Sequence, residues 1–227
     1  IVNQGAYYLL AFATLGALLT ASLFLPNEDG ALSTAGIAIK KRATLLLSLW
    51  FLTSLIGSVL KVQQILELSI SEAFDLNTLN SYLTQTSLGR SIFLQMALLA
   101  IALLLIPFFK RVIPLLIIIG ISLIAFIAPI FQSHAAASGS HALAIGALVT
   151  HVIALSLWVG GLFGIVLAPK ELRIIALYRF SALALWAAIS VVVSGAATAW
   201  TRLNEKSAWG TQYAYVVIAK VILTAVL

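Results

Sequence analysis

The sequence predicts an all-α protein that crosses a membrane as a bundle of about seven helices, within a single domain over residues 1–227. Composition is the first observation: 62% of the 227 residues are hydrophobic and only 9% are charged, whereas a soluble domain carries about 25% charged side chains. The second observation is that apolar runs of about 20 residues, long enough to cross a hydrocarbon core, recur along the chain. We therefore expect the lipid bilayer to surround most of the surface.

The expected spans alternate with polar connections. Residues 61–90 interleave apolar side chains with Glu67, Glu72 and Asp75, which predicts a partly helical loop at the membrane interface. The chain stops inside its last apolar run, so we expect the native protein to continue beyond Leu227. The expected spans cover residues 6–26, 43–60, 91–109, 112–131, 142–168, 174–200 and 213–227.

Basic residues are divided unequally between the two sides of the bundle. Because positively charged loops are retained in the cytoplasm, we expect the N-terminus and residues 132–141 to lie outside. The net charge of +6 then reflects topology, and nucleic acid is not an expected partner. The loops after the first, third and fifth spans, together with the adjoining start of the sixth span, hold eight basic residues, Lys40, Lys41, Arg42, Lys110, Arg111, Lys170, Arg173 and Arg179, whereas the other side holds Lys61, Arg90, Arg202 and Lys206.

A weak internal repeat relates the first three spans to the last three. Helical units duplicated in this way can enclose a site between the two halves, although so few matched positions can also arise by chance. The matching positions are Thr86, Gly89 and Gln95 in one half, and Thr211, Ala214 and Lys220 in the other.

The three histidines fall within 18 residues and form the best candidate site. The chain has no cysteine, so imidazole is its best nitrogen or sulfur ligand for copper, zinc, iron or nickel. His134 and His141 bracket a sequence of small residues that can fold around one ion at the outer surface. The alternative interpretation is a solvated loop that binds no metal.

His151 differs from the other two because it lies inside an apolar span, where an ionisable group usually faces a partner or a pathway. If the helix is continuous from His141, His151 lies about 15 Å deeper and about 80° further round the axis, so one ion cannot contact both. We expect an outer capture site and a deeper relay site. The alternative is a neutral imidazole bonded to a neighbouring helix. Met96 is a weaker candidate ligand for copper(I), with core packing as its alternative role.

Small residues indicate where helices approach each other closely. Gly160 and Gly164 have the Gly-x-x-x-Gly spacing, with Gly161 between them. The span at 174–200 offers a matching face of Ser190, Ser194 and Gly195, so we expect these two spans to pack together. Arg179 and Lys220 are expected to extend to the interface. The sequence contains no phosphate-binding loop, activated nucleophile or carboxylate pair in a span, so we expect no enzyme.

Four motifs in the last 95 residues form a specific combination. They are Ser-His-Ala-Ala-Ala-Ser-Gly-Ser-His-Ala-Leu-Ala at 133–144, Leu-Trp-Val-Gly-Gly-Leu at 157–162, Arg-Phe-Ser-Ala-Leu-Ala-Leu-Trp at 179–186 and Thr-x-Tyr-Ala-Tyr-x4-Lys at 211–220. The combination resembles the copper resistance D family of bacterial membrane proteins, in which glycine is usual where this chain has Ala214. The first 130 residues resemble it more loosely, through the element from Thr86 to Gln95.

The resemblance implies a copper-handling protein of the bacterial cytoplasmic membrane, for copper transport and resistance or for supplying copper to oxidase assembly. The form fused ahead of a CtaG-type cytochrome c oxidase assembly domain is the most similar. Its implied partners are cytochrome oxidase or a copper chaperone, and its implied ligands are the outward histidines. Two alternatives stay open: a b-type haem protein with His151 as an axial ligand, and a non-catalytic assembly or accessory subunit of a respiratory complex.

Overall fold

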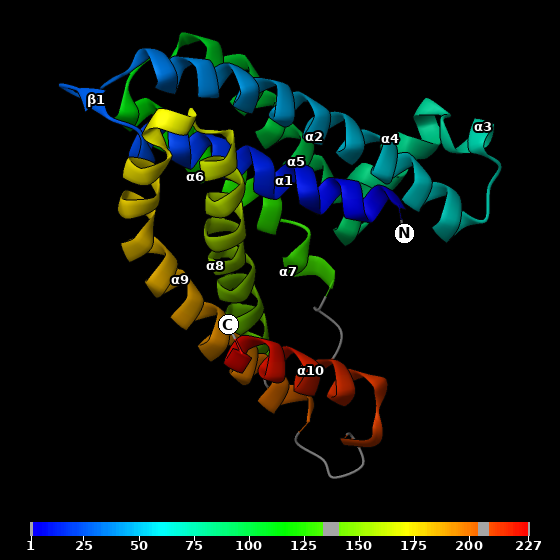
Figure 1. Cartoon of the computed structure of the whole chain (residues 1–227). Coiled ribbons are helices and arrows are strands. Elements are labelled where there is room, and N and C mark those ends of the chain that lie inside the picture. The colour runs from blue at the N-terminus through cyan, green and yellow to red at the C-terminus, as the bar shows by residue number, and fades with distance from the viewer. Residues whose placement is uncertain (1, 134–140, 204–208, 227) are drawn as a thin grey trace.

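The computed structural model describes residues 2–133, 141–203 and 209–226, and helices dominate these ranges (Figure 1). The all-α class is therefore confirmed. The helices are α1 (Val2–Leu19), α2 (Thr34–Leu66), α3 (Ile70–Ala73), α4 (Leu76–Gln85), α5 (Ser87–Leu105), α6 (Val112–Ile127), α7 (Ile130–Ser133), α8 (His141–Leu167), α9 (Arg173–Arg202) and α10 (Gln212–Val226). Short elements are the π-helix η1 (Thr20–Phe24), the 3-10 turns η2 (Ile106–Phe108) and η3 (Lys170–Leu172), and the strands β1 (Asn27–Glu28) and β2 (Ala31–Leu32).

Five helices among the described residues are long and apolar enough to cross a membrane. α6 is also apolar but has only 16 residues, and α10 has 15, fewer than the roughly 20 that a straight crossing requires. The polytopic bundle is thus confirmed, and the count of seven spans stays a prediction. The five candidate spans are Asn3–Phe24, Thr34–Leu66, Ser87–Phe108, Ile145–Leu167 and Lys170–Trp200.

The second expected span, residues 43–60, lies inside a longer helix, because α2 begins at Thr34. Ser33 caps the helix, its side chain accepting a hydrogen bond from the Gly36 amide at 3.2 Å. The basic cluster at residues 40–42 therefore lies inside the helix and not in the expected loop. At its other end α2 continues to Leu66, so only the part after it forms the interfacial segment with α3 and α4.

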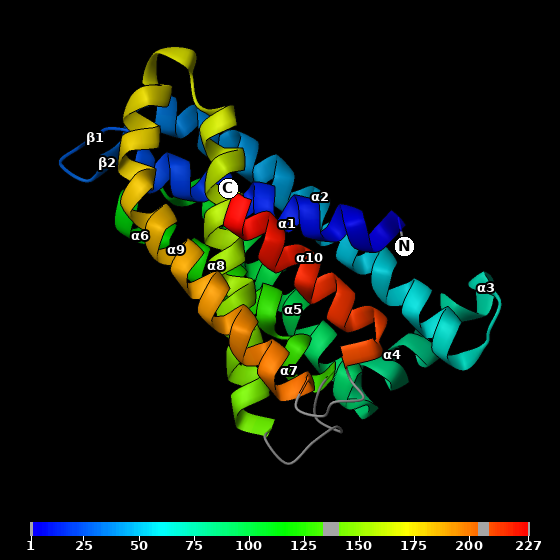
Figure 2. The same cartoon turned by 60° about the horizontal axis from the view of Figure 1, so that its bottom comes forward.

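α1 is the central helix of the bundle. It packs against α2, α6 and α8, and the side chains of Leu15 and Leu18 are fully buried. Figures 1 and 2 show α1, α2 and α5 running side by side, while the hairpin of α8 and α9 crosses them near one end. Large apolar side chains elsewhere point outward, for example Phe108 and Ile174. This apolar exterior suits a lipid environment.

The tight hairpin of β1 and β2 joins α1 to α2 at the basic end of the bundle. Asp29 and Gly30 have positive φ angles of 47° and 77°, as a two-residue type I′ turn requires. Leu32 donates its amide proton to the Lys110 carbonyl at 3.0 Å, and Arg111 bonds the Asp29 carbonyl at 3.0 Å. The loops after α1 and α5 therefore lie together.

Basic side chains at this end donate to backbone carbonyls where helices terminate. Lys40 bonds the Phe109 carbonyl after η2 at 2.8 Å, Arg42 bonds Leu167 at the end of α8 at 2.9 Å, and Arg179 bonds Leu25 after η1 at 2.8 Å. Cations suit these positions because a helix C-terminus carries about half a negative charge. The basic loops expected on one side do meet at one end of the molecule. Their cytoplasmic orientation stays a prediction.

Candidate metal site on helix α8

His151 lies in the middle of α8 and faces α9. Its Nδ1 atom is 3.1 Å from the Val191 carbonyl oxygen and 3.1 Å from the Ser194 hydroxyl oxygen. A carbonyl oxygen only accepts hydrogen bonds, so this contact assigns the proton to Nδ1. In that tautomer Nε2 carries the lone pair, and it is the nitrogen that can coordinate a metal.

Ser194 supports the same assignment. Its hydroxyl donates its single proton to the Ser190 carbonyl one turn earlier on α9, which leaves its oxygen to accept from His151. Gly195 lies beside the ring: a Cβ there would lie 3.5 Å from Cε1 of His151, an ordinary van der Waals contact. The sequence pattern predicts only helix packing for Ser194 and Gly195, and the structure adds their contact with His151. Their spacing from Ser190 on one helix face is the signal that a polar side chain could dock there.

Three of the four glycines of α8, Gly160, Gly161 and Gly164, face two different helices. Gly161 lies against the Phe180 ring of α9, as the expected pairing of these spans requires. Gly160 and Gly164 instead lie against α1, where a Cβ on Gly16 would overlap the Gly160 carbonyl oxygen and a Cβ on Gly164 would overlap the Gly16 carbonyl oxygen. The Gly-x-x-x-Gly pair therefore serves the crossing with α1.

The outer histidines are placed only in part. His134 lies outside the described residues. His141 is the first residue of α8, and its side chain lies outside the described part. α8 is continuous from His141 to Leu167, so His151 lies about 15 Å further along the axis. In the described portion of the chain, no three His, Cys, Asp or Glu side chains gather in a group that could hold a metal ion.

Met96 lies in a separate apolar cluster between α2, α4 and α5. It is partly buried there and packs against a core whose members include Tyr82 and Ile92. These neighbours offer no second soft ligand. The sulfur therefore has the surroundings of a core methionine.

Gln95, which the sequence marked only as a repeat position, forms a polar contact inside the bundle. Its side-chain amide donates to the Tyr7 hydroxyl of α1 at 2.5 Å. The Tyr7 ring also packs within 6.1 Å of Trp50 and 5.8 Å of Phe126, measured between ring centroids. Neither charge patterns nor the spacing of metal ligands in the sequence could have predicted that Tyr7 and Gln95 form a pair. It links α1 to α5 through a neutral hydrogen bond.

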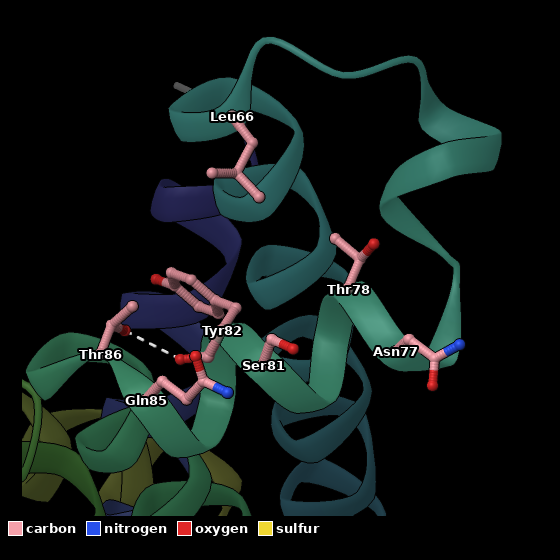
Figure 3. A pocket seen from close by; sticks show the side chains of 7 residues that line it. All are labelled: Leu66, Asn77, Thr78, Ser81, Tyr82, Gln85 and Thr86. Carbon is pink, nitrogen blue, oxygen red and sulfur yellow. Dashed lines mark hydrogen bonds between the residues drawn. The ribbon is translucent and has the colours of Figure 1, made fainter.

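A cavity of about 430 Å³ opens between the end of α2 and helix α4 (Figure 3). Figure 3 shows the Thr86 hydroxyl bonded to the Tyr82 carbonyl, at 2.8 Å, and burial raises the pKa of the Tyr82 phenol. Its described lining residues offer hydroxyls and amides but no histidine, methionine, cysteine or carboxylate, so they lack the ligands that copper prefers. It is lined by Leu66, Asn77, Thr78, Ser81, Tyr82, Gln85 and Thr86.

The structure describes some of the positions expected to form the internal repeat. Thr86 caps α5, accepting a hydrogen bond from the Gly89 amide at 2.9 Å, and Thr211 directly precedes α10. This parallel is compatible with the internal repeat, which stays a prediction. The Lys220 side chain lies outside the described part.

Comparison with known proteins gives one match. Residues 1–143 match the family model described as copper resistance protein D-like, N-terminal domain, whereas no curated protein and no solved structure matches the chain. The matched segment contains His134 and His141 and ends before His151. It includes the first 130 residues, whose motifs resemble the copper resistance D family less closely than those of the last 95 residues do. The match does not include an oxidase assembly domain. Since this segment makes up more than half of the sequence, the chain belongs to the copper resistance protein D-like family.

Proposed function

We propose that this protein moves copper ions across or into the bacterial cytoplasmic membrane. His134 and His141 capture the ion at the outer surface, and His151 passes it inward. Family membership supports a copper-related role, and imidazole nitrogen suits copper. The proposed role requires ion binding and release but no catalytic group, so it is not an enzymatic one.

The observation that carries the proposal is the anchoring of His151. Hydrogen bonds from Nδ1 to a carbonyl or carboxylate typically orient metal-binding histidines and make their other nitrogen more basic. His151 has such a bond to Val191 at 3.1 Å and a second contact with Ser194. The ring is thereby fixed in one tautomer, and the Nε2 atom that would receive copper is the basic one.

The distance along α8 divides the proposed path into two steps. His141 and His151 are separated by about 15 Å on a continuous helix. An ion held at the outer pair must therefore leave it before it reaches His151. Capture and relay should accordingly be separable by mutation, which a single three-histidine centre would not allow.

Copper stoichiometry of the purified chain tests the capture step. We expect the double variant His134→Ala/His141→Ala to bind less copper than the wild type and His151→Ala to keep the outer ion. Thr150→Ala, at the exposed position beside His151 on α8, is the matched control for a substitution in this helix. Unchanged stoichiometry in the double variant would rule out the capture role.

The geometry at His151 also favours a second candidate, a b-type haem protein. Axial haem histidines are likewise oriented by a hydrogen bond from the ring nitrogen that does not bind iron. An absorption spectrum of the purified protein separates the two candidates, because haem gives a Soret band and a copper-imidazole site does not. If the wild type has a Soret band and His151→Ala lacks it, His151 is a haem ligand, and the copper relay is rejected in favour of the haem protein.

The destination of the copper is a separate proposal. Detoxification needs no partner, whereas supply to an oxidase requires contact with its assembly machinery or with a copper chaperone. Purification from membranes in mild detergent, without added copper, tests this contact. Oxidase subunits or a chaperone in the purified fraction, absent when an unrelated membrane protein is purified in the same way, would support the supply role and also an accessory-subunit role.

A further inference from the structure

A second cavity, of about 310 Å³, lies at the basic end of the bundle between the start of α2 and the end of α8. Three cationic residues line it: Arg42 from α2, Lys170 from η3 and Arg173 at the start of α9. The other described residues of the lining are apolar, including Ile39 and Val166, and none of them is acidic. The copper path proposed above does not use this cavity.

The two arginines already have partners at the end of α8. Arg42 donates to the Leu167 carbonyl at 2.9 Å, and Arg173 donates to the Val166 and Ala168 carbonyls at 2.8 and 3.2 Å. A helix C-terminus offers about half a negative charge, which offsets only a small part of three unit positive charges. A guanidinium has five N–H groups, so both arginines keep donors beyond those used in these bonds.

Capping of α8 accounts for the two arginines, and retention of basic loops on one side accounts for a cation at Lys170. Neither explains why three like charges border one open space, and the exposed Lys170 side chain makes no hydrogen bond to any described residue. An anion in the cavity would reduce the mutual repulsion and use the remaining donors.

We propose that this cavity binds a phosphate group, that of an anionic phospholipid headgroup. Arginine and lysine are the side chains that bind phosphate most often, the former through paired N–H donors. The cavity lies where membrane helices end, which is the depth of lipid headgroups, and basic pockets between such helices bind anionic lipids. The apolar walls at Ile39 and Val166 suit the upper part of an acyl chain. Free phosphate is the other source of the same chemistry.

The test uses the whole chain, stripped of lipid in an uncharged detergent, and measures binding of three probes by native mass spectrometry and by thermal stabilisation. The probes are phosphatidylglycerol, phosphatidylcholine and inorganic phosphate. Lys170→Gln is the main variant, since it removes a charge but no hydrogen bond to a described residue. We expect it to weaken phosphatidylglycerol binding about fivefold, the loss that corresponds to about 1 kcal/mol per cation near a membrane surface.

Lys41→Gln is the matched control, because Lys41 is an exposed cation beside Arg42 that does not line the cavity. We expect it to bind phosphatidylglycerol as the wild type does. Equal binding of phosphatidylcholine and phosphatidylglycerol, or an equal loss in Lys41→Gln and Lys170→Gln, would overturn the proposal. Inorganic phosphate that binds as tightly as phosphatidylglycerol, and is weakened by Lys170→Gln alone, would support the phosphate site and assign it to a soluble ion.

Discussion

The α-carbon of Gly16 lies so close to the backbone of Gly160 that a Cβ on Gly16 would overlap the Gly160 carbonyl oxygen. Gly16 belongs to α1, within the segment that matches the family, and Gly160 belongs to α8, the helix that carries His151. This crossing therefore attaches the proposed relay histidine to the matched segment. Small residues permit such close contact between membrane helices.

We expect Gly16→Ala and Gly164→Ala to lower the unfolding temperature in detergent. Each added methyl group would meet backbone of the facing helix, and overpacking of this kind costs about 1–3 kcal/mol. Gly146→Ala is the control on α8, since no atom of a described residue lies within 4 Å of a Cβ placed there. It should leave stability unchanged or raise it slightly, because alanine favours helix more than glycine does. Equal destabilisation by all three variants would contradict the crossing.

Lys40→Met should destabilise the protein by about 2 kcal/mol. The Lys40 ammonium is buried and donates to the carbonyls of Ile106, Pro107 and Phe109, at 3.2, 3.3 and 2.8 Å. A methionine would fill similar space but leave these three oxygens without that donor. Denaturant unfolding of the purified chain measures the loss. Lys41→Met, at an exposed position, should change little, and similar losses in both variants would argue against the capping role.

Tyr7 and Gln95 should be energetically coupled. Their side chains form a hydrogen bond of 2.5 Å between α1 and α5, and interhelical bonds of this kind contribute about 0.6 kcal/mol on average inside membranes. A double-mutant cycle with Tyr7→Phe and Gln95→Leu measures the coupling. We expect a positive value of about 0.6–1.7 kcal/mol. Strict additivity of the two single variants would show that the bond adds nothing to stability.

The capping box of the short helix α3 should weaken in acid. The Ser69 hydroxyl and amide donate to the Glu72 carboxylate at 2.6 and 2.9 Å, and they hold the pKa of that carboxyl below its usual value. Since the folded pKa is the lower one, the stabilisation from these two bonds is fully present above the unfolded pKa and is lost as pH falls through the folded pKa. The protection factor of the Ser69 amide in hydrogen exchange should fall over that range in the wild type. In Glu72→Gln it should not vary with pH there.

Local patterns predicted the fold class well because burial in lipid imposes simple rules on a chain. Apolar runs gave all five long helices, and the one-sided basic loops do meet at one end. Lys40 was expected in a loop because it is a basic residue next to an apolar run, but it lies inside α2. Its burial depends on carbonyls about 70 residues away, at Ile106 to Phe109, and no local pattern reports them.

The candidate site was predictable in its residues but not in its contacts. An ionisable side chain in an apolar span indicated that His151 faces a partner, and the structure supplies Val191 and Ser194. The spacing of Gly160 and Gly164 showed that some helix approaches, but it could not say that this helix is α1. The cavity beside Arg42 could not be predicted from the sequence, because the residues that line it come from segments more than 100 residues apart.

Copper uptake into proteoliposomes containing a trapped copper indicator tests most directly whether the ion passes His151. We expect His151→Ala to slow uptake more than about tenfold, because even a lost supporting partner of a metal ligand costs 10–100-fold in affinity. Thr150→Ala should take up copper at the wild-type rate. Uptake by His151→Ala at the wild-type rate, in vesicles with equal amounts of folded protein, would contradict the relay.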